Sequence, residues 1–376
     1  MKILSYESNT GEANLKFYPI NFGVNNLIVG ASGCGKTRLL NTIFNGAVMA
    51  LRSDKFFVGY WKYKFEHKDV RYIWEVRTNN DSSDNQGRFV LETLSTVNDN
   101  GDETFIFNRI DDEITFEGKQ VPKLTNRQSC IYLFKEEPSI KPVFEGMSSI
   151  MRRNFSGSDL ADESLFQKLP NSTLKRVEKS KKLFEIFESS LNVSCKLFLL
   201  KKVFNKRFLS VKSEFMSIFP FVKEFDIVDG EEFGVNLTGN VPTIAIKESF
   251  NNSWFPISQI SSGMKKVILM LVDLQTLPEW GGVYIVDEYE NSLGINAINF
   301  FPSSLANTDS GSQLIITSHH PYLISNFPVK DWILVYREGE NVKNIAGLEL
   351  EKKFGKSKQN SFTQLINDEY YSEGIS

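Results

Sequence analysis

One eight-residue segment constrains this chain more than any other, because it fits the pattern GxxxxGK[ST] in full. It runs Gly30-Ala31-Ser32-Gly33-Cys34-Gly35-Lys36-Thr37. An apolar strand, Leu27–Val29, precedes it, and helix-forming residues beginning at Arg38 follow, which is the context that the pattern requires. Glycines let backbone N–H groups surround phosphate oxygens, and the start of a helix adds positive potential. The segment therefore predicts a phosphate-binding loop.

The residue types in this loop suggest their individual roles. We expect Lys36 to bridge the β- and γ-phosphates of a nucleotide, and the Thr37 hydroxyl to ligate magnesium. Cys34 is expected to be a tolerated small residue, not a redox switch. The residues expected to contact the nucleotide here are Gly30, Ser32, Gly33, Cys34, Gly35, Lys36, Thr37 and Arg38.

A second apolar strand, Val283–Val286, ends in the two carboxylates Asp287 and Glu288. Ligands gather at the carboxyl ends of buried parallel strands. Asp287 is expected to hold magnesium through water. Glu288, one residue on, is expected to point elsewhere and to polarise the attacking water. An ordinary strand followed by an acidic turn gives the same pattern, so this element alone does not decide the class.

Two further elements extend the pattern. Ser261, Ser262 and Gly263 open an expected helix that continues to Leu274. They predict either a second anion site, for the γ-phosphate of a neighbouring subunit, or a simple helix N-cap. The strand Leu314–Thr317 is followed by Ser318-His319-His320-Pro321, which holds two of the three histidines of the chain. An imidazole at a strand end can contact a γ-phosphate.

Composition limits the remaining choices. A chain of 376 residues, 41% of them hydrophobic, is long enough for two or three domains at about 150 residues each. Three cysteines without a CxxC pair argue against a disulfide scaffold or zinc ribbon, and favour a cytoplasmic location. No signal peptide is visible, and the longest apolar stretch, near Val267–Val272, is far shorter than the roughly 20 residues of a membrane span.

The pattern along the chain predicts three segments. Residues 1–125 hold the phosphate loop and an antiparallel β-layer beside the nucleotide core, with strands expected at Phe56–Phe65, Arg71–Arg77, Phe89–Thr96, Thr104–Arg109 and Glu113–Glu117. Residues 126–224 form a helical insertion, in which a loop is expected at 154–162 and the most helical part of the chain follows it. In it, apolar residues from Leu197 to Ile218 predict one helix that Pro220 ends, packed as a short hairpin on a poorer helix over 174–191. Residues 225–376 alternate strand and helix, as in a parallel α/β sheet.

In order and spacing, these elements resemble an ABC-type ATPase, and most of all its SMC/RecF/OLD-like branch, in which the signature contains SSG. Gly30–Thr37 resembles Walker A, Ser261–Lys265 the signature and Val283–Glu288 Walker B. Ser292–Gly294 occupies the D-loop position, and His319 is the switch histidine. Gly294 stands where the family's LHP sequence has its histidine. The role of the family histidine is therefore not carried over to this chain. Gln128, before the apolar run Ser129–Phe134, is the candidate Q-loop residue.

This resemblance implies the fold and the reaction. The fold would be α/β, a P-loop NTPase head of the ABC type with an antiparallel β-subdomain and an inserted helical segment. The cofactors would be ATP and Mg²⁺. Two heads would pair head-to-tail as a homodimer or a higher even-numbered oligomer, with each ATP between one copy's phosphate loop and the other's signature. Hydrolysis through Glu288 would open the pair.

Several purposes are compatible with such a head. The 226 positions between Lys36 and Ser262 argue against a transporter subunit. A DNA-repair or chromosome ATPase would use residues 171–212, which contain 11 Lys/Arg and 3 Glu, as a contact for DNA. A slow nucleotide-gated scaffold also stays open.

We favour a resemblance to bacterial anti-phage defence ATPases, such as those of the Septu, PARIS and retron-associated systems or the ATPase half of OLD nucleases. These control an effector nuclease. Only 57 residues follow His319, too few for a Toprim nuclease domain. We therefore expect no intrinsic nuclease, and an effector on a separate polypeptide.

Overall fold

The computed structural model describes residues 1–10, 15–80, 87–154, 166–234, 239–278, 280–298, 311–355 and 358–372. Contacts divide the chain into two compact units, both assembled from separated segments. The first unit comprises Met1–Arg153, Trp280–Glu288 and Gly311–Ser376, and the second comprises Asn154–Glu279 and Tyr289–Ser310. The segment 126–224, expected as one insertion, is thereby shared between the two units. Of the loop expected at 154–162, only Asn154 lies within the described residues.

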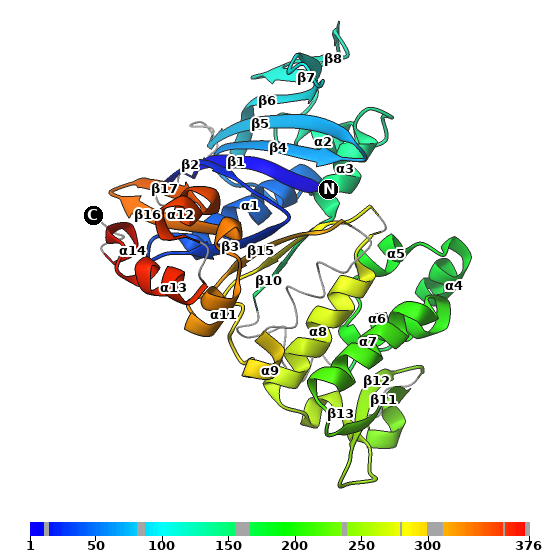
Figure 1. The fold of residues 1–376 in the computed structure, drawn as a ribbon. Coiled ribbons are helices and arrows are strands. Elements are labelled where there is room, and N and C mark those ends of the chain that lie inside the picture. Colours follow the sequence, from blue (N-terminus) through cyan, green and yellow to red (C-terminus); the bar gives the residue numbers. More distant parts are fainter. Residues whose placement is uncertain are drawn as a thin grey trace. The chain divides into compact units, whose positions relative to one another are not determined.

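The first unit is built on a single sheet of 14 strands, in the order β10-β14-β15-β3-β16-β17-β2-β1-β4-β5-β6-β7-β8-β9 (Figure 1). Four successive pairings from β10 to β16 are parallel, and they form the nucleotide-side core that the sequence predicts. The strands of this part are β3 (Asn25–Val29), β10 (Ile150–Arg153), β14 (Val283–Val286), β15 (Gln313–Thr317) and β16 (Trp332–Glu338). All four residues of β14 are buried, as expected of a strand covered on both faces.

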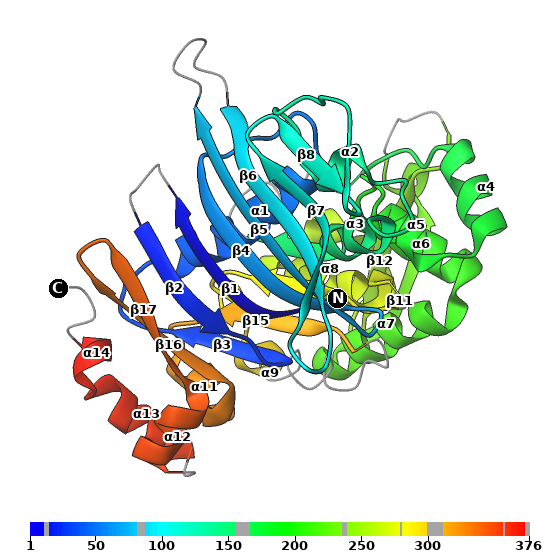
Figure 2. The same ribbon diagram turned by 90° about the horizontal axis from the view of Figure 1, so that it is seen from above.

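The antiparallel strands continue this sheet instead of forming a separate layer beside it (Figure 2). The five strands expected between residues 56 and 117 are confirmed, with bounds that differ by up to three residues at each end. This part contains β1 (Lys2–Thr10), β2 (Leu15–Asn21), β4 (Gly59–His67), β5 (Val70–Asn80), β6 (Gly87–Val97), β7 (Glu103–Ile110), β8 (Glu113–Phe116), β9 (Lys119–Gln120) and β17 (Asn341–Ala346). Alternate residues such as Trp61, Tyr63 and Phe65 of β4 turn into the core, which fixes the register of the strands.

Helix α1 (Lys36–Leu51) lies against strands β1 and β4 and buries one side in the core of this unit (Figure 1). The remaining helices of the first unit are short, and no described helix is long and apolar enough to cross a membrane. They are α2 (Cys130–Leu133), α3 (Lys141–Ser148), α11 (Pro321–Asn326), α12 (Gly347–Phe354), α13 (Lys358–Ile366) and α14 (Glu369–Ser372).

The second unit is mainly helical, with a core that includes Phe208, Phe215 and Phe225. Its described helices are α4 (Asn171–Ser180), α5 (Leu183–Phe187), α6 (Val193–Val203), α7 (Asn205–Ile218), α8 (Ser262–Thr276) and α9 (Ile295–Ile298). A small antiparallel sheet joins them, formed by β11 (Val222–Asp229), β12 (Pro242–Glu248) and β13 (Phe255–Pro256). Helix α8 matches the helix expected from the sequence and is buried along nearly its whole length.

The prediction of one long helix over Leu197–Ile218 was wrong. The chain breaks at Phe204, whose φ of −125° and ψ of 54° are not helical, so α6 and α7 are separate helices. The apolar spacing continues across the break because both helices bury their apolar residues in the same core. The preceding helix is likewise divided at Lys181, which has a φ of 50°. Four short helices therefore replace the expected hairpin.

Candidate functional site

A cavity of about 360 Å³ lies where the phosphate loop meets the carboxyl ends of strands β14 and β15. Every residue that lines it belongs to the first unit. They are Leu15, Ser32, Gly33, Gly35, Lys36, Thr37, Arg38, Asp287, Glu288, Thr317, His319 and Arg337. Three segments that are distant in the sequence thus share one cavity, as the parallel order of their strands predicts.

The phosphate loop has the backbone geometry that its glycines allow. Gly33 and Gly35 have φ values of 85° and 108°, which favour glycine, and Gly35 directly precedes the first residue of α1. The Lys36 ammonium donates to the carbonyls of Gly30 and Ala31, at 2.8 Å each. Burial lowers the pKa of Lys36, and nearby Asp287 and Glu288 act in the opposite direction. The lysine is therefore held by the loop beside two carboxylates.

Cys34 differs from the other loop residues expected to contact the nucleotide. Its side chain is fully buried in the core of the first unit and does not line the cavity. Burial raises the pKa of its thiol, which disfavours the reactive thiolate. Gly30 also lies outside the lining, and a Cβ at its position would stand 2.2 Å from the Val335 carbonyl oxygen. Cys34 and Gly30 therefore pack against the protein interior and do not face the cavity.

The two carboxylates after β14 face the same cavity, contrary to the expectation that Glu288 points elsewhere. Successive residues of a strand point to opposite sides, but the strand ends here because Glu288 has a φ of 45°. Thr317, at the end of β15, connects the pair. Its hydroxyl donates to Asp287 Oδ1 at 2.6 Å and accepts the backbone N–H of Glu288 at 2.8 Å.

Thr37 and Asp287 suit a magnesium ion by their chemistry. Both offer oxygen atoms to the cavity, and Mg²⁺ is bound in proteins through one or two carboxylates, hydroxyls and substrate phosphates. The Asp287 side chain is only 6% exposed, so its charge is little screened by solvent. The residues present therefore fit the metal that the phosphate loop implies.

Arg152 is a neighbour of this site that sequence reasoning did not identify. It lies in β10, which pairs in parallel with β14, and its Nη2 atom is 3.9 Å from Asp287 Oδ2. The backbone carbonyl of Arg153 accepts the Asp287 N–H at 3.3 Å. Four residues containing two arginines carry no recognisable strand pattern. The order of two apolar residues and then two basic ones does not alternate, so it gave no signal of a strand.

Of the adjacent histidines, His319 is exposed and lines the cavity, whereas His320 is half-buried and directly precedes α11. The His320 backbone N–H donates to the Ser318 hydroxyl at 3.0 Å, which closes the turn after β15. The structure thus brings His319 together with the phosphate loop and the carboxylates.

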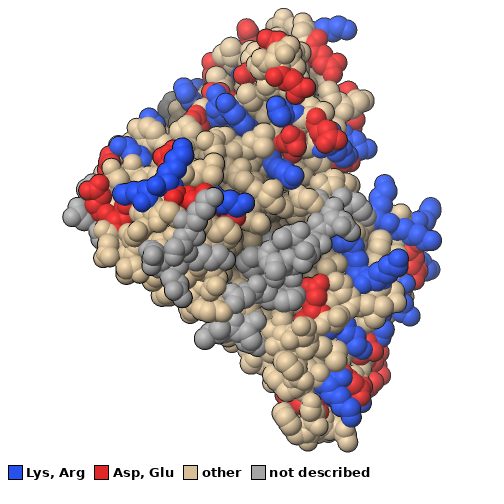
Figure 3. Space-filling view, viewed as in Figure 1, with Lys and Arg blue, Asp and Glu red and all other residues tan. Residues whose placement is uncertain are grey.

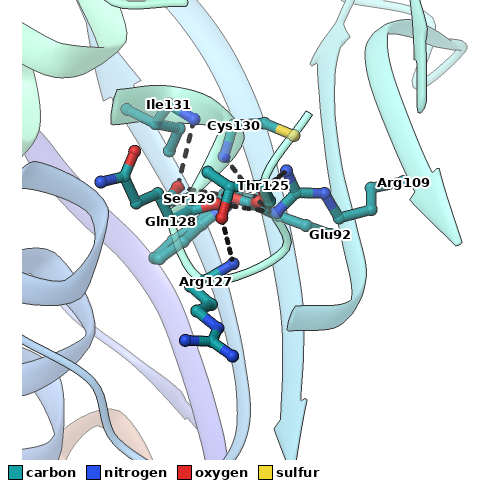
Figure 4. Close-up of polar contacts among 9 residues, drawn as sticks. Glu92, Arg109, Thr125, Arg127, Gln128, Ser129, Cys130 and Ile131 are labelled. Carbon is teal, nitrogen blue, oxygen red and sulfur yellow. Dashed lines mark hydrogen bonds and ion pairs between the residues drawn. The ribbon is translucent and has the colours of Figure 1, made fainter. Parts of the chain in front are cut away.

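Gln128 is not among the residues that line this cavity. Its segment is fixed to the β-layer by a buried pair, Glu92 and Arg109 (Figure 4). Arg109 donates to the carbonyls of Gln128 and Thr125, at 2.8 and 3.1 Å. Glu92 accepts the Ser129 hydroxyl and the Cys130 backbone N–H, the latter at 2.7 Å. The segment of Gln128 does not pair with β14. The neighbours of β14 in the sheet are β15 and β10, and β10 ends at Arg153.

The serine-glycine segment lies in the second unit, at the start of the 15-residue helix α8. Ser261 caps the helix by accepting the Met264 N–H at 3.3 Å, and Ser262 is exposed. A Cβ on Gly263 would stand 2.5 Å from the Ser292 carbonyl oxygen. The buried ammonium of Lys266 donates to the carbonyls of Tyr289 and Asn291, at 2.8 and 2.7 Å. The start of α8 is therefore fixed against the segment that contains Ser292–Gly294.

The basic segment 171–212 forms helices α4 to α7, and only part of its charge is available. Lys196 is buried, Arg176 pairs with Glu185 at 2.7 Å, and Lys201 pairs with Asp226 at 2.5 Å. Lysine and arginine side chains gather over α4 and α5 (Figure 3). The exposed lysines of the segment are Lys175, Lys179, Lys181, Lys182, Lys202 and Lys206.

Comparison with known proteins gives one family match, confined to residues 247–325, to a family described as "AAA domain, putative AbiEii toxin, Type IV TA system". These residues include the start of α8, the Asp287–Glu288 pair and His319. No curated protein matches the chain.

Solved structures with a similar fold include SMC heads. One is the SmcHead bound to the C-winged helix domain of ScpA, with TM-score 0.48 and 13% identity over 92% of this chain and 98% of that one. Another is the Smc head domain with an extended coiled coil bound to the C-terminal domain of ScpA from Pyrococcus furiosus, with TM-score 0.47 and 13% identity over 94% and 98%. The SMC head domain from Thermotoga maritima has TM-score 0.40 and 11% identity over 92% and 99%.

Proposed function

We propose that this chain binds ATP with Mg²⁺, hydrolyses it, and uses the pairing of two copies to control a separate effector protein. The supporting observation is the shared cavity, which combines the phosphate loop, the carboxylates after β14 and His319 after β15. Phosphoryl transfer depends mostly on positioning and charge stabilisation, and this cavity provides groups for both.

The polar residues predicted from the sequence each have a role in this proposal. The backbone N–H groups of the loop and the Lys36 ammonium bind the β- and γ-phosphates. Thr37 and Asp287 hold Mg²⁺, which neutralises negative charge on the phosphate oxygens. Glu288 accepts a proton from the water that attacks the γ-phosphorus, while the bond between that phosphorus and the β,γ-bridging oxygen breaks. His319 contacts the γ-phosphate and distinguishes ATP from ADP.

Pairing completes the site in this proposal. Ser261, Ser262 and Gly263 bind the γ-phosphate held by a second copy, at the positive end of helix α8. The exposed hydroxyl of Ser262 and the length of the helix support this role. A single copy is then nearly inactive, and turnover depends on concentration.

The effector that we favour is a nuclease in anti-phage defence. The family match over residues 247–325, whose description names a putative toxin of a Type IV TA system, supports a place in a toxin-type system and does not bear on the nuclease. The effector is a separate polypeptide. A DNA-repair or chromosome ATPase is the second candidate, and the exposed lysines around α4 and α5 favour it, since they suit a phosphate backbone without sequence preference. The third candidate, a slow nucleotide-gated scaffold, differs in having negligible turnover.

Substitution Glu288→Gln tests the central proposal. With ATP and Mg²⁺ present, it should trap a dimer in size-exclusion chromatography with light scattering, and lower kcat by about 10²-fold or more. Glu340→Gln, at an exposed turn, is the matched control and should behave as wild type. Equal hydrolysis rates for wild type and Glu288→Gln would exclude Glu288 as the base. Wild-type turnover near zero would favour the scaffold.

A second pair of measurements distinguishes anti-phage defence from action on DNA. If the defence proposal is correct, cells that express the chain with its neighbouring genes should resist phage, and Lys36→Ala should abolish that resistance. If DNA is the ligand, the double substitution of Lys179 and Lys182 by Glu should weaken binding to duplex DNA and reduce its salt dependence by about two ion equivalents. Unchanged phage plating together with lysine-dependent DNA binding would overturn the defence proposal.

A further inference from the structure

Arg152 of strand β10 pairs with Asp287 without lining the phosphate cavity. Its Nη2 atom is 3.9 Å from Asp287 Oδ2, and the two side chains are 17% and 6% exposed. Among the described residues that line the cavity, none comes from β10. Arg152 therefore influences the cavity through Asp287, the carboxylate that the proposed function assigns to Mg²⁺.

The register of two strands fixes the position of Arg152. Strand β10 pairs in parallel with β14, and Arg152 stands opposite Ile285. Side chains alternate along a strand, so Arg152 and Arg153 point to opposite sides of the sheet. The Asp287 N–H donates to the Arg153 carbonyl at 3.3 Å, which continues the pairing of the strands up to the carboxylate. The place of Arg152 beside Asp287 is thus set by the sheet and not by a loop.

The two carboxylate oxygens of Asp287 have different neighbours. Oδ1 accepts the Thr317 hydroxyl at 2.6 Å, whereas Oδ2 faces Arg152. The 3.9 Å separation from Arg152 is too long for a hydrogen bond but short enough for opposite charges to attract. Because both side chains are largely buried, solvent screens this attraction little. Arg152 therefore offsets the charge of the carboxylate without a hydrogen bond that would occupy Oδ2.

The charged side chains around the cavity favour anions over cations. Three cationic side chains and two carboxylates line it, and Arg152 adds a fourth positive charge beside it. The charged residues of the lining are Lys36, Arg38, Arg337, Asp287 and Glu288. Mg²⁺ gives up its waters reluctantly and binds proteins through one or two carboxylates together with substrate phosphates. A divalent cation that enters alone meets a surplus of positive charge, which the phosphates of a nucleotide reverse.

We infer that Arg152 is a positioning residue that makes metal binding at Asp287 depend on the nucleotide. It offsets the charge of Asp287 enough that the nucleotide-free site does not retain a divalent cation. The phosphates supply the missing negative charge, so the metal enters with the nucleotide or after it. This inference rests on the proposed function, because it takes Asp287 as a metal ligand, and it adds an order of binding that the proposed function does not contain.

Binding of Mn²⁺ in the absence of nucleotide tests this inference. Mn²⁺ prefers the same carboxylate and water ligands as Mg²⁺ and can be followed by electron paramagnetic resonance. Arg152→Met removes the charge and keeps an extended side chain, and we expect it to bind Mn²⁺ at least tenfold more tightly than wild type. Arg153→Met makes the same change of charge on the other side of the sheet, so this matched control should bind Mn²⁺ as wild type does. Adding Asp287→Asn to Arg152→Met should abolish the gain, which locates the ion at Asp287.

A nucleotide titration separates this effect from general damage to the site. In isothermal titration calorimetry with a non-hydrolysable ATP analogue and Mg²⁺, Arg152→Met should bind within threefold of wild type, because the phosphates outweigh a single guanidinium. The effect of the substitution should therefore be large only without nucleotide. A role of Arg152 in folding alone would lower the melting temperature and leave Mn²⁺ affinity unchanged, and that result would overturn the inference.

Arg152→Gln is the second variant and should show the same gain in Mn²⁺ affinity if Arg152→Met does not fold. Wild type itself should bind Mn²⁺ without nucleotide no more tightly than Asp287→Asn does, and tighter binding by wild type would overturn the inference without any Arg152 variant. If wild type binds the analogue with Mg²⁺ and neither Arg152 variant gains Mn²⁺ affinity, this inference is wrong while the proposed function stands. If wild type does not bind the analogue, both are wrong.

Discussion

The hydroxyl of Thr317 donates to Asp287 across two neighbouring parallel strands, at 2.6 Å, and accepts the N–H of the next residue. One side chain therefore sets the orientation of the carboxylate expected to hold Mg²⁺ and the backbone of the residue expected to act as base. Because Thr317 is itself 1% exposed, no water can easily take over these bonds.

Thr317→Val keeps the shape of the side chain and removes both hydrogen bonds. We expect the concentration of Mg²⁺ needed for half-maximal ATP hydrolysis to rise, and kcat to fall by about tenfold, because each lost bond costs about 1–3 kcal/mol when a buried group is left unpaired. Hydrolysis measured in a magnesium titration checks this. Thr317→Ser should retain both properties, and a Val variant with wild-type magnesium dependence would contradict the assigned role.

Gly263→Ala tests how tightly the start of α8 is packed. The new Cβ would stand 2.5 Å from the Ser292 carbonyl oxygen, and a backbone atom cannot move as cheaply as a flexible side chain. We expect a loss of about 1–3 kcal/mol in stability, as for other overpacked sites, together with loss of the ATP-dependent dimer. Thermal unfolding and light scattering measure the two effects. Gly23→Ala, whose Cβ would meet nothing closer than 3.8 Å, should show neither.

Glu92 and Arg109 face each other across strands β6 and β7, and both side chains are fully buried. Glu92 also accepts the indole N–H of Trp74 at 3.1 Å. Glu92→Gln leaves the arginine charge without compensation, so we expect a cost of about 3–5 kcal/mol. This corresponds to a melting temperature lower by roughly 6–20 °C.

The matched control for this prediction is Glu75→Gln. Glu75 pairs with Lys62 at 2.9 Å on a partly exposed face, where an ion pair contributes only about 0–1 kcal/mol. Similar melting temperatures for the two variants would show that the buried pair contributes no more than a surface one.

His67 should make the fold sensitive to acid. Burial, assisted by the nearby positive charges of the N-terminal ammonium and of Lys68, lowers the pKa of His67 from 6.5 to about 3. Below pH 6.5 the unfolded chain takes up a proton at His67 that the folded chain does not, so the His67 contribution lowers the free energy of unfolding as the pH drops from about 6.5 to about 3. By linkage the loss from His67 reaches about 2 kcal/mol at pH 5. The buried Met1 ammonium, whose pKa is lowered from 8.0 to about 5, adds a contribution of the same sign between about pH 8 and 5.

His67→Phe should reduce this dependence to the part that comes from the Met1 ammonium, and it should be tolerated because neither ring nitrogen has a hydrogen-bond partner among the described residues. Melting temperatures of wild type and variant, compared between pH 8 and pH 5, measure the difference. A His67→Phe variant that loses stability in acid as steeply as wild type would contradict the prediction.

The parts of the site that sequence predicts are those with a local pattern. The phosphate loop and the ends of β14 and β15 can each be recognised within ten residues, because an apolar strand is followed directly by polar residues. Thr317 and Arg152 were missed because their importance arises from pairing between strands that are distant in the sequence. The position of Gln128 outside the cavity could not be predicted for the same reason. Its segment is held by Glu92 and Arg109, two residues that belong to no local sequence pattern.

The helical second unit shows a different limit of prediction from the sequence. Apolar spacing correctly identified the residues of the core but not the break at Phe204, because two helices that share one core repeat the same periodicity. Spacing reports which side of a helix is buried. It does not report where the backbone changes direction.

The order of strands in the first unit has a consequence during synthesis. Thr37 lies in the first tenth of the chain and Asp287 in the last quarter, yet strand β15 alone separates their strands β3 and β14. A ribosome therefore releases the phosphate loop long before it synthesises Asp287 and Glu288, the carboxylates that we propose act with it. A nascent chain that ends before β14 can carry the loop but cannot complete the cavity that Asp287, Glu288 and His319 help to line.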